Sequence, residues 1–572
     1  SDDCNRDSSV LIKELMHTNP SILVDAFYKR LDFGTGGLRA LMGFGTNRIN
    51  EYTICAATQG FANYILKLQE NMNSIIIGYD TRINSSTYAI EAAKVLAANG
   101  IKVYLFNAPI PTPLISFGCR LKKCSGAIII TASHNPPQYN GFKVYWRDGA
   151  QVLFPHDIGI IKEVNNIENN SSIKRTQNFN PLTSFIGSEI FDDYVKLLKE
   201  KQYYFKDNQK YGCDLYIIYT SLHGTGTNFV PKALKSWGFN NIKLVSVQCT
   251  PDGSFPTIQT PNPELVEAME LGNVMLKEEK ADILLATDPD CDRIGISVNH
   301  QNTPVFLTGN QIACLCTEHI CYALTSQNIM PRNAAFIKTV VTTELMSLIA
   351  KKYGAQCFNT LTGFKYIAEI IEKWTTNKED GFKFLFGAEE AHGYLLGDFV
   401  RDKDAISSCT LISEIALQAK LNGKTLIDLL DEIYRKYGFF YENVESIQFP
   451  EEKKGHETMN NFMESLRISF PEKIDGIKVE FLEDYQSSLK RDMINGKESI
   501  IELPKSNLLC FWLEKGIKIM IRPSGTEPKI KIYCEISMEY KNDSIEELKT
   551  KCEKIMKGLI KSIKAFHNFS DY

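Results

Sequence analysis

A serine, a histidine and a lysine follow an apolar run in the segment TASHNPPQYNGFKVY, residues 131–145. The run GAIII predicts a buried strand, so Ser133 and His134 should lie on a tight loop shaped by small residues and prolines. A serine hydroxyl is a poor nucleophile by itself, and His134 and Lys143 are candidates to supply charge or to move a proton. The alternative is a turn whose serine only caps a helix, and this segment alone leaves both interpretations open.

Three aspartates alternate in ATDPDCDRIG, at positions 288, 290 and 292, directly after another apolar run. Alternate positions on an extended loop can point three carboxylates towards one place. Carboxylate oxygens suit Mg²⁺, which keeps octahedral geometry and takes its remaining ligands from phosphate or water. An EF-hand is excluded because its glycine and distal glutamate are missing. A solvated acidic turn stays open as the alternative.

A third loop with chemical potential is MIRPSGTEPKIKIY, residues 520–533, between two predicted strands. Arg522, Ser524, Gly525 and Thr526 combine a guanidinium group, hydroxyls and backbone N–H groups, which together fit a phosphate dianion. By itself this loop would not identify a site.

The elements that must position these loops repeat one pattern, a short β-branched run, a polar loop and a helical stretch. Examples are NSIIIGYDTR, GCDLYIIYTSLHGTG, KADILLATDPDCDRIG and KFLFGAEEAHG. This alternation predicts parallel sheets flanked by helices, with functional loops at the carboxyl ends of strands. After about Glu442 the pattern changes to strands such as IKIMIRP and a terminal helix, which predicts a smaller α+β domain. The length of 572 residues predicts three to four domains.

The amino-acid composition argues against a nucleic-acid-binding or membrane protein. The hydrophobic content of 44% and a formal net charge of -4 are ordinary for a globular chain, with no basic excess suited to nucleic acid or anionic membranes. Apolar runs stay shorter than the roughly 20 residues that span a bilayer, and the first residues are polar, unlike a signal peptide. We therefore expect a cytoplasmic protein with a small-molecule partner.

The 15 cysteines are scattered, which favours reduced thiols over a disulfide framework. One cluster, ACLCTEHIC, raises the question of zinc, through Cys314, Cys316, His319 and Cys321. Paired CxxC spacing is missing there, so a helix with buried thiols is the preferred interpretation.

Taken together, the loops resemble those of the α-D-phosphohexomutase superfamily, the phosphoglucomutases and phosphomannomutases. TASHNP is similar to the family's active-site serine loop, DPDCDR to its magnesium loop, GAEEAHG to its sugar-binding loop and RPSGTEP to its phosphate-binding loop. FGTGGLRALMG and DFVRDKDAI resemble the branch that contains phosphoglucomutase/phosphopentomutase enzymes. The resemblance implies an α/β fold of four domains around a central cleft, with three related mixed-sheet domains and a smaller C-terminal α+β domain. We expect these domains at residues 1–208, 209–325, 326–442 and 443–572.

The resemblance also implies roles for the residues of the transferring site. Ser133 would carry the phosphoryl group, whose oxygen would complete a Mg²⁺ site with Asp288, Asp290 and Asp292. Arg39 and Arg293 would clamp the same group. Lys143 would be the general base, with a pKa lowered by burial and neighbouring cations, and His134 would support it or shuttle a proton.

Substrate recognition would fall to the remaining loops. Glu389 is expected to accept hydrogen bonds from sugar hydroxyls. Ala391 stands where related sequences have a serine, a contact that His392 could replace, and Lys403 is expected to contact the substrate phosphate. The other residues expected to bind substrate are Thr362, Gly363, Arg522, Ser524, Gly525, Thr526 and Lys531. For Asp80 and Arg82 of GYDTR, a structural ion pair is the preferred interpretation.

The function implied by the resemblance is interconversion of glucose 1-phosphate and glucose 6-phosphate through a phosphoserine, with glucose 1,6-bisphosphate as intermediate and activator. Phosphopentomutase and phosphomannomutase activities are the alternatives among mutases. A metal-dependent phosphatase and a catalytically silent phosphosugar-binding protein are the alternatives outside them. We expect a monomer or a weak homodimer that binds neither nucleic acid nor membranes.

Overall fold

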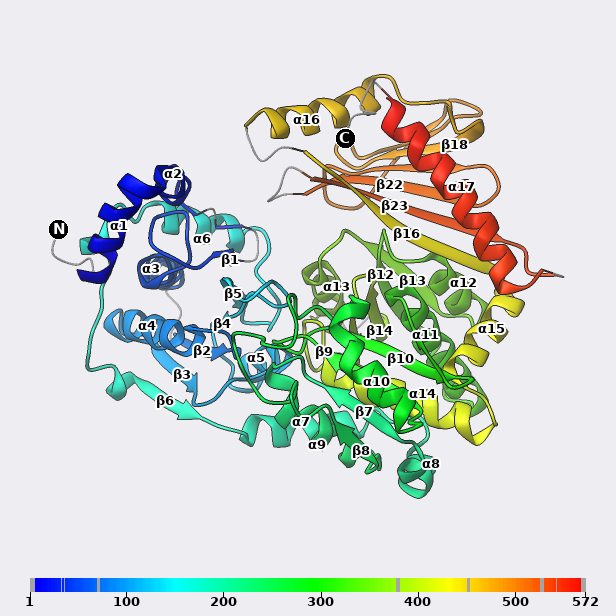
Figure 1. Ribbon diagram of the computed structural model, residues 1–572, viewed down its shortest axis with the longest axis horizontal. Helices are drawn as coiled ribbons and strands as arrows, with labels where there is room; N and C mark the ends of the chain where they lie inside the picture. Colours follow the sequence, from blue (N-terminus) through cyan, green and yellow to red (C-terminus); the bar gives the residue numbers. More distant parts are fainter. Residues whose placement is uncertain are drawn as a thin grey trace.

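Four β-sheets follow one another along the chain in the computed structural model, each covered by helices (Figure 1). The structure describes residues 6–31, 33–34, 37–68, 73–376, 381–449, 453–524, 529–541 and 543–566. We number the sheets I to IV in chain order. Figure 1 shows sheet I and its helices on one side and sheet IV above the helices of sheet III.

Sheet I has the strand order β1-β5-β4-β2-β3-β6. Its inner strands β2 and β4 are apolar and almost wholly buried, as expected for parallel strands covered on both faces. Antiparallel β5 pairs with β4 and β1, so the sheet is mixed. The strands are β1 (Gly37–Leu41), β2 (Ser74–Tyr79), β3 (Lys102–Phe106), β4 (Gly126–Ile130), β5 (Tyr139–Trp146) and β6 (Thr183–Ile186). The helices are α1 (Arg6–Thr18), α2 (Pro20–Phe27), α3 (Glu51–Lys67), α4 (Ser85–Ala98), α5 (Thr112–Leu121), α6 (His156–Asn165) and α7 (Glu189–Lys199).

Sheets II and III are also mixed, with antiparallel strands at one edge of a parallel core. Sheet II has the order β11-β10-β9-β7-β8 and sheet III the order β13-β12-β14-β15. The elements of sheet II are α8 (Phe205–Tyr211), β7 (Ile217–Thr220), α9 (Val230–Ser236), β8 (Ile242–Leu244), α10 (Glu270–Glu278), β9 (Ile283–Thr287), β10 (Ile294–His300) and β11 (Thr303–Phe306). Those of sheet III are α11 (Gly309–Ser326), β12 (Ala334–Thr339), α12 (Glu344–Lys352), β13 (Gln356–Thr360), α13 (Phe364–Thr376), β14 (Lys383–Glu389), β15 (Gly393–Leu396), α14 (Ala405–Leu421) and α15 (Leu426–Tyr437).

Sheet IV differs in kind, because every strand pair described in it is antiparallel. Its main path runs β16-β23-β22-β21-β18-β19-β20, with β17 paired to β18. The elements are β16 (Phe439–Gln448), α16 (Lys453–Ile468), β17 (Lys473–Ile474), β18 (Ile477–Asp484), β19 (Leu489–Asp492), β20 (Glu498–Ile500), β21 (Leu509–Leu513), β22 (Ile517–Pro523), β23 (Lys529–Met538) and α17 (Ile545–Ala565). The prediction of three mixed-sheet α/β domains and a C-terminal α+β domain is confirmed.

The exact domain boundaries stay predictions. Residues 208, 325 and 442 lie inside α8, α11 and β16, so no linker marks them. One hydrophobic core contains residues of all four sheets, for example Ile76, Leu285, Phe336 and Ile519, and this core joins the units. Within the described ranges, no helix is both long enough and apolar enough to cross a membrane.

The cysteine cluster ACLCTEHIC forms part of α11, and its three thiols are buried. His319 Nε2 lies 3.0 Å from Glu414 Oε1, where the ring N–H donates to the carboxylate. The interpretation as a helix with buried thiols is confirmed. His319 faces a carboxylate of α14. Glu414 is fully buried and also accepts hydrogen bonds from the backbone N–H groups of Tyr203 and Tyr204 and the amide of Asn208.

We predict that Glu414→Ala lowers the free energy of unfolding by about 3 kcal/mol, because it leaves several buried donors without an acceptor. Urea unfolding followed by tryptophan fluorescence measures the change. The control is Glu432→Ala, which removes an exposed ion pair with Lys424 and should cost less than about 1 kcal/mol. Equal losses in both variants would contradict the anchoring role of Glu414.

Candidate active site

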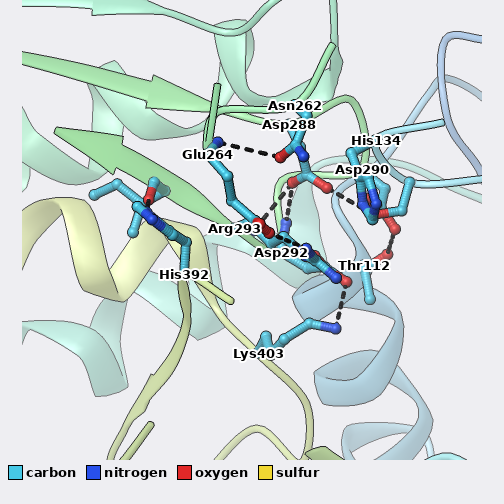
Figure 2. Close-up of polar contacts among 12 residues, drawn as sticks. Thr112, His134, Asn262, Glu264, Asp288, Asp290, Asp292, Arg293, His392 and Lys403 are labelled. Carbon is cyan, nitrogen blue, oxygen red and sulfur yellow. Dashed lines mark hydrogen bonds and ion pairs between the residues drawn. The ribbon is translucent and has the colours of Figure 1, made fainter. Parts of the chain in front are cut away.

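The three aspartates lie on the loop between β9 and β10 and point towards one another (Figure 2). Their carboxylates are almost fully buried, and one oxygen of each lies within 4.8 Å of the others. The turn is tight: Cys291 has a φ of 55°, and Asp288 Oδ1 accepts from the N–H groups of Asp292 and Arg293 at 2.9 and 3.0 Å. Among the described residues, this is the one group of His, Cys, Asp and Glu side chains that could hold a metal ion.

Two lysines from other sheets balance the negative charge of the aspartates. Lys143 of β5 places Nζ 2.7 Å from Asp290 Oδ2 and 3.3 Å from Asp292 Oδ2. Lys403, which precedes α14, places Nζ 2.9 Å from Asp292 Oδ2. The other oxygen of Asp290 and of Asp292 is buried without a hydrogen bond. Buried acceptors in this state are what a divalent cation would require, so the residues fit a metal.

The pKa values of the aspartates move apart. Burial, followed by the charges of Asp290 and Asp292, raises the pKa of Asp288 well above its usual value. Burial acts in the same direction on Asp292, but Lys403 and Lys143 outweigh it and lower that pKa. Asp288 is therefore the carboxyl group that holds a proton most readily, and a bound cation would displace this proton.

Ser133 lies against this acidic group. Its loop follows β4, its φ is 51°, and its hydroxyl donates to Asp288 Oδ2 at 2.8 Å. His134 Nδ1 lies 3.2 Å from the same hydroxyl oxygen. Burial, together with the charges of Arg293 and Arg39, lowers the pKa of His134 well below its usual value. The imidazole is therefore neutral near pH 7, and its lowered pKa makes it a weak proton acceptor.

The pKa of Lys143 moves in the direction opposite to the one expected from the sequence. Its pKa is raised, because the charges of Asp290 and Asp292 outweigh the opposing effect of burial. The prediction of a lowered pKa is wrong: the expected neighbours were cations, and the closest neighbours are carboxylates. Lys143 is protonated while these ion pairs persist.

The two arginines near the serine loop have different partners. Arg39 of β1 is exposed and donates to Asn135 Oδ1 at 3.0 Å. Arg293 forms an ion pair with Glu264. Burial alone would lower the pKa of Arg293, but the negative charges of Glu264 and the aspartates outweigh burial and raise this pKa. Arg293 thus has a carboxylate partner, Glu264 (Figure 2), whereas the described partner of Arg39 is the amide of Asn135.

The sugar-loop candidate Glu389 ends β14 and is buried. Its Oε1 accepts from Gly363 N–H at 2.9 Å, which brings the segment containing Thr362 and Gly363 beside it. Burial raises the pKa of Glu389 to about 7. His392 lies deeper: it is buried, its Nδ1 lies 3.0 Å from the carbonyl oxygen of Ile294, and its ring stacks on a phenylalanine of β11. His392 therefore braces the loop against sheet II.

Lys403 contacts the metal group through Asp292, where the sequence had suggested a contact with substrate phosphate. Its segment is held on both sides. Asp402 accepts a hydrogen bond from the hydroxyl of Tyr145 at 2.6 Å, and Asp404 accepts one from Tyr194 at 2.5 Å. Asp404 also caps α14.

From sheet IV, Arg522 and Ser524 lie at the end of β22, and Lys531 pairs in register with Arg522 on β23. Burial lowers the pKa of Lys531, and the nearby charges of Glu390 and Glu264 act in the opposite direction. Because Glu390 belongs to the sugar loop, this edge of sheet IV faces that loop. Gly525 and Thr526 lie outside the described residues.

Several residues that shape the site could not be recognised from the sequence. Thr112, at the start of α5, donates from Oγ1 to Asp290 Oδ2 and from N–H to the Asp290 carbonyl oxygen, both at 2.8 Å (Figure 2). Glu264 neutralises Arg293, and Tyr145 orients Asp402. A threonine at a helix start is an ordinary capping signal, so only the fold reveals its partner.

Models of one protein family match most of the chain. The three matched models are described as phosphoglucomutase/phosphomannomutase α/β/α domains I, II and III, and they match residues 30–171, 192–301 and 308–437. The phosphoglucomutase of Staphylococcus haemolyticus (strain JCSC1435) is 37% identical over 517 residues, which cover 90% of this chain and 91% of the relative. That of Staphylococcus aureus (strain bovine RF122) is 35% identical over 531 residues, 92% and 93% of the two chains.

Solved structures share the fold over nearly the whole length. The open form of pp63/parafusin, a phosphoglucomutase from Paramecium, matches with a TM-score of 0.70 at 18% identity, over 94% of this chain and 96% of that one. A putative phosphomannomutase from Thermus thermophilus matches with a TM-score of 0.66 at 20% identity, over 93% and 100% of the chains.

We predict that Glu389→Gln gains stability relative to the wild type as the pH rises. Because the folded pKa of about 7 exceeds the usual value of 4.5, the folded state binds more protons than the unfolded state between these values. Wild-type stability contributed by this group is present at low pH and is lost as the pH rises through 7, by up to about 3 kcal/mol. Urea unfolding of both proteins from pH 5 to 8 measures the difference, in which shared groups cancel. A difference independent of pH would contradict the shifted pKa.

Proposed function

The chain belongs to the phosphoglucomutase branch of the phosphoglucomutase/phosphomannomutase family, and we propose that it interconverts glucose 1-phosphate and glucose 6-phosphate through a phosphoserine at Ser133. As a member of this family it is an intramolecular phosphotransferase. The observation that carries the proposal is the Ser133 hydroxyl, 2.8 Å from Asp288 within a buried acidic group. A phosphoryl group on this oxygen would lie beside the metal-binding candidates. The non-enzymatic binding protein and the phosphatase are disfavoured by the family assignment.

The proposed metal is Mg²⁺, held by Asp288, Asp290 and Asp292. When bound, Mg²⁺ neutralises charge on the transferring phosphoryl group, whose loose transition state depends on positioning and electrostatics. Thr112 orients Asp290, and Lys403 orients Asp292. Partners of this kind fix ligand direction and typically affect metal affinity about 10- to 100-fold.

In the proposed reaction the bond between phosphorus and Ser133 Oγ breaks while one forms to a sugar hydroxyl oxygen, and the hydroxyl proton passes to a base. His134 Nδ1 lies 3.2 Å from Oγ, and this contact supports a role for His134 beside the transferring group, as a hydrogen-bonding partner or a proton shuttle. Lys143 can act as the base only when Asp290 and Asp292 have another cationic partner. Arg39, open to solvent at the serine loop, is the proposed clamp for the transferring group.

The second half of the proposed reaction reverses the first transfer. The glucose 1,6-bisphosphate intermediate turns end for end, and its other phosphate returns to Ser133, which explains why the bisphosphate would activate a dephosphorylated enzyme. The proposed holding site for the distal phosphate consists of Arg522, Ser524, Gly525, Thr526 and Lys531. Arg522 and Lys531 are register partners on the adjacent strands β22 and β23, and this pairing of two cationic side chains supports the proposal.

Sugar choice rests on Glu389, with Thr362 and Gly363 as a neighbouring wall. Ala391 offers no hydroxyl at its position, which favours phosphopentomutase activity as the second candidate, with phosphomannomutase third. The expected cytoplasmic location and the monomer or weak homodimer stay predictions.

We predict that the purified protein, given a trace of the matching bisphosphate, converts glucose 1-phosphate faster than ribose 1-phosphate or mannose 1-phosphate. Ser133→Ala should lose about 10³-fold or more of this activity, because the hydroxyl that carries the phosphoryl group is removed. Ser184→Ala, at an exposed position of β6, is the control and should keep full activity. Full activity of Ser133→Ala would rule out the phosphoserine route, and a faster pentose reaction would favour the second candidate.

We predict that chelation of divalent cations abolishes turnover and that added Mg²⁺ restores it. Thr112→Val should raise the Mg²⁺ concentration for half-maximal activity about 10-fold, because Asp290 loses a hydrogen bond that orients it. Thr317→Val is the matched control, since its hydroxyl bonds only within α11. An unchanged Mg²⁺ requirement in Thr112→Val, or turnover that survives chelation, would argue against the metal assignment.

A further inference from the structure

The side chain of Arg82 lies fully buried beneath the loop that carries Ser133. Its two terminal nitrogens donate to four backbone carbonyl oxygens of that loop. Nη2 donates to Ser133 at 2.6 Å and to Asn135, and Nη1 donates to Pro136 at 2.9 Å and to Tyr139 at 3.0 Å. One planar guanidinium group thus closes the loop from both ends.

The loop needs such support. Ser133 has a φ of 51°, a left-handed conformation that costs a residue with a side chain about 1–2 kcal/mol. Its N–H is satisfied locally, by Thr131 Oγ1 at 2.8 Å. Its carbonyl oxygen faces the interior and requires a donor, which Arg82 supplies. Without this donor the peptide that follows Ser133 would have reason to rotate, and the hydroxyl would move with it.

Arg82 is itself held from behind by an ion pair with Asp80. Its Nε faces Asp80 Oδ2 at 3.3 Å, and Asp80 Oδ1 accepts from the Arg82 N–H at 2.9 Å and from the Ser85 hydroxyl at 2.7 Å. All four N–H groups on the terminal nitrogens point at the loop. The expected ion pair with Asp80 is present, but it serves to aim the guanidinium group at the backbone of the serine loop.

A second connection joins Arg82 to the unit that carries the aspartates. Its guanidinium carbon lies 5.0 Å from the centre of the Phe255 ring, and its backbone forms a parallel bridge with Gly253. The fit at Gly253 is close: a Cβ added there would lie 2.4 Å from the backbone nitrogen of Ile83. Thr81, one residue earlier, donates to the carbonyl oxygen of His223 at 2.9 Å.

We propose that Arg82 is a positioning residue for phosphoryl transfer, which fixes the Ser133 hydroxyl relative to the acidic group and ties the serine loop to the segment of residues 250–257. This inference rests on the proposed phosphoserine role of Ser133. In-line transfer requires the reacting atoms to be about 3–3.5 Å apart and aligned, and a displacement of about 1 Å can cost about 100-fold in rate. Arg82 acts through the loop and touches no substrate.

The first test is Arg82→Lys, which keeps the charge but replaces a fork of donors with a single ammonium group. We expect kcat for glucose 1-phosphate to fall about 100-fold while KM changes less than about 3-fold, because binding groups stay in place. The matched control is Arg30→Lys. Arg30 also donates through both terminal nitrogens to backbone carbonyls, those of Ile167 and Glu168, outside the site, and this variant should keep its kcat.

The second test is rescue of Arg82→Ala by free guanidinium ion at millimolar concentration. Refilling the cavity should restore kcat at least about 10-fold, with no such gain from sodium chloride at the same concentration or for Ser133→Ala. A wild-type kcat in Arg82→Lys overturns the proposal. The proposal is also overturned if kcat falls equally in Arg30→Lys. It is overturned as well if the fall in kcat of Arg82→Lys is matched by an equal rise in KM. If Arg82→Ala does not fold, the kinetics of Arg82→Lys decide.

A third measurement separates this proposal from the one on which it rests. Wild-type protein and Arg82→Lys are incubated with glucose 1,6-bisphosphate, and peptide mass spectrometry determines the phosphorylated fraction of Ser133 over time. Phosphorylation that is fast in the wild type and about 100-fold slower in the variant supports both proposals. Wild-type protein that is active but never phosphorylated at Ser133 refutes the phosphoserine, whereas equal rates in the two proteins refute only the positioning role of Arg82.

Discussion

The structure depends on balancing the charge of three carboxylates that lie within 4.8 Å of one another in the interior. Unpaired buried carboxylates cost several kcal/mol each, so the loop between β9 and β10 is tenable only with cations beside it. Those cations come from elsewhere: Lys143 belongs to sheet I, and Lys403 follows sheet III. The ion pairs that create the site therefore also link three sheets, in addition to the hydrophobic core that they share.

The segment around Lys403 shows how such packing is specified. Three consecutive side chains point in three directions: Asp402 accepts from Tyr145 of sheet I, Lys403 reaches Asp292 of sheet II, and Asp404 caps its own helix. An extended segment directs successive side chains to different sides, which allows one short stretch to contact several units. The contact between Lys403 and substrate phosphate stays a prediction, and the structure adds the ion pair between Lys403 and Asp292.

The sequence predicted the strand-loop-helix order and the loops of Ser133 and Asp288, because a short stretch of chain determines each of them. The four units were predicted from the resemblance of these loops to a known family. Distant partners could not be predicted in this way. Nothing near Lys143 in the sequence indicates two carboxylates, so its pKa was expected to move in the wrong direction. Thr112 and Arg82 likewise carry only local signals, a helix start and an aspartate neighbour, whereas their main contacts lie far along the chain. The sequence therefore identifies candidate reacting groups more readily than the residues that orient them.

The order of the charged groups also matters while the protein is being made. A ribosome delivers Lys143 before the aspartates, but Lys403 only after nearly all of sheet III. Domains generally fold as units during synthesis, in order from the N-terminus. A nascent chain that ends between these points must therefore keep an acidic loop with only one of its two lysines.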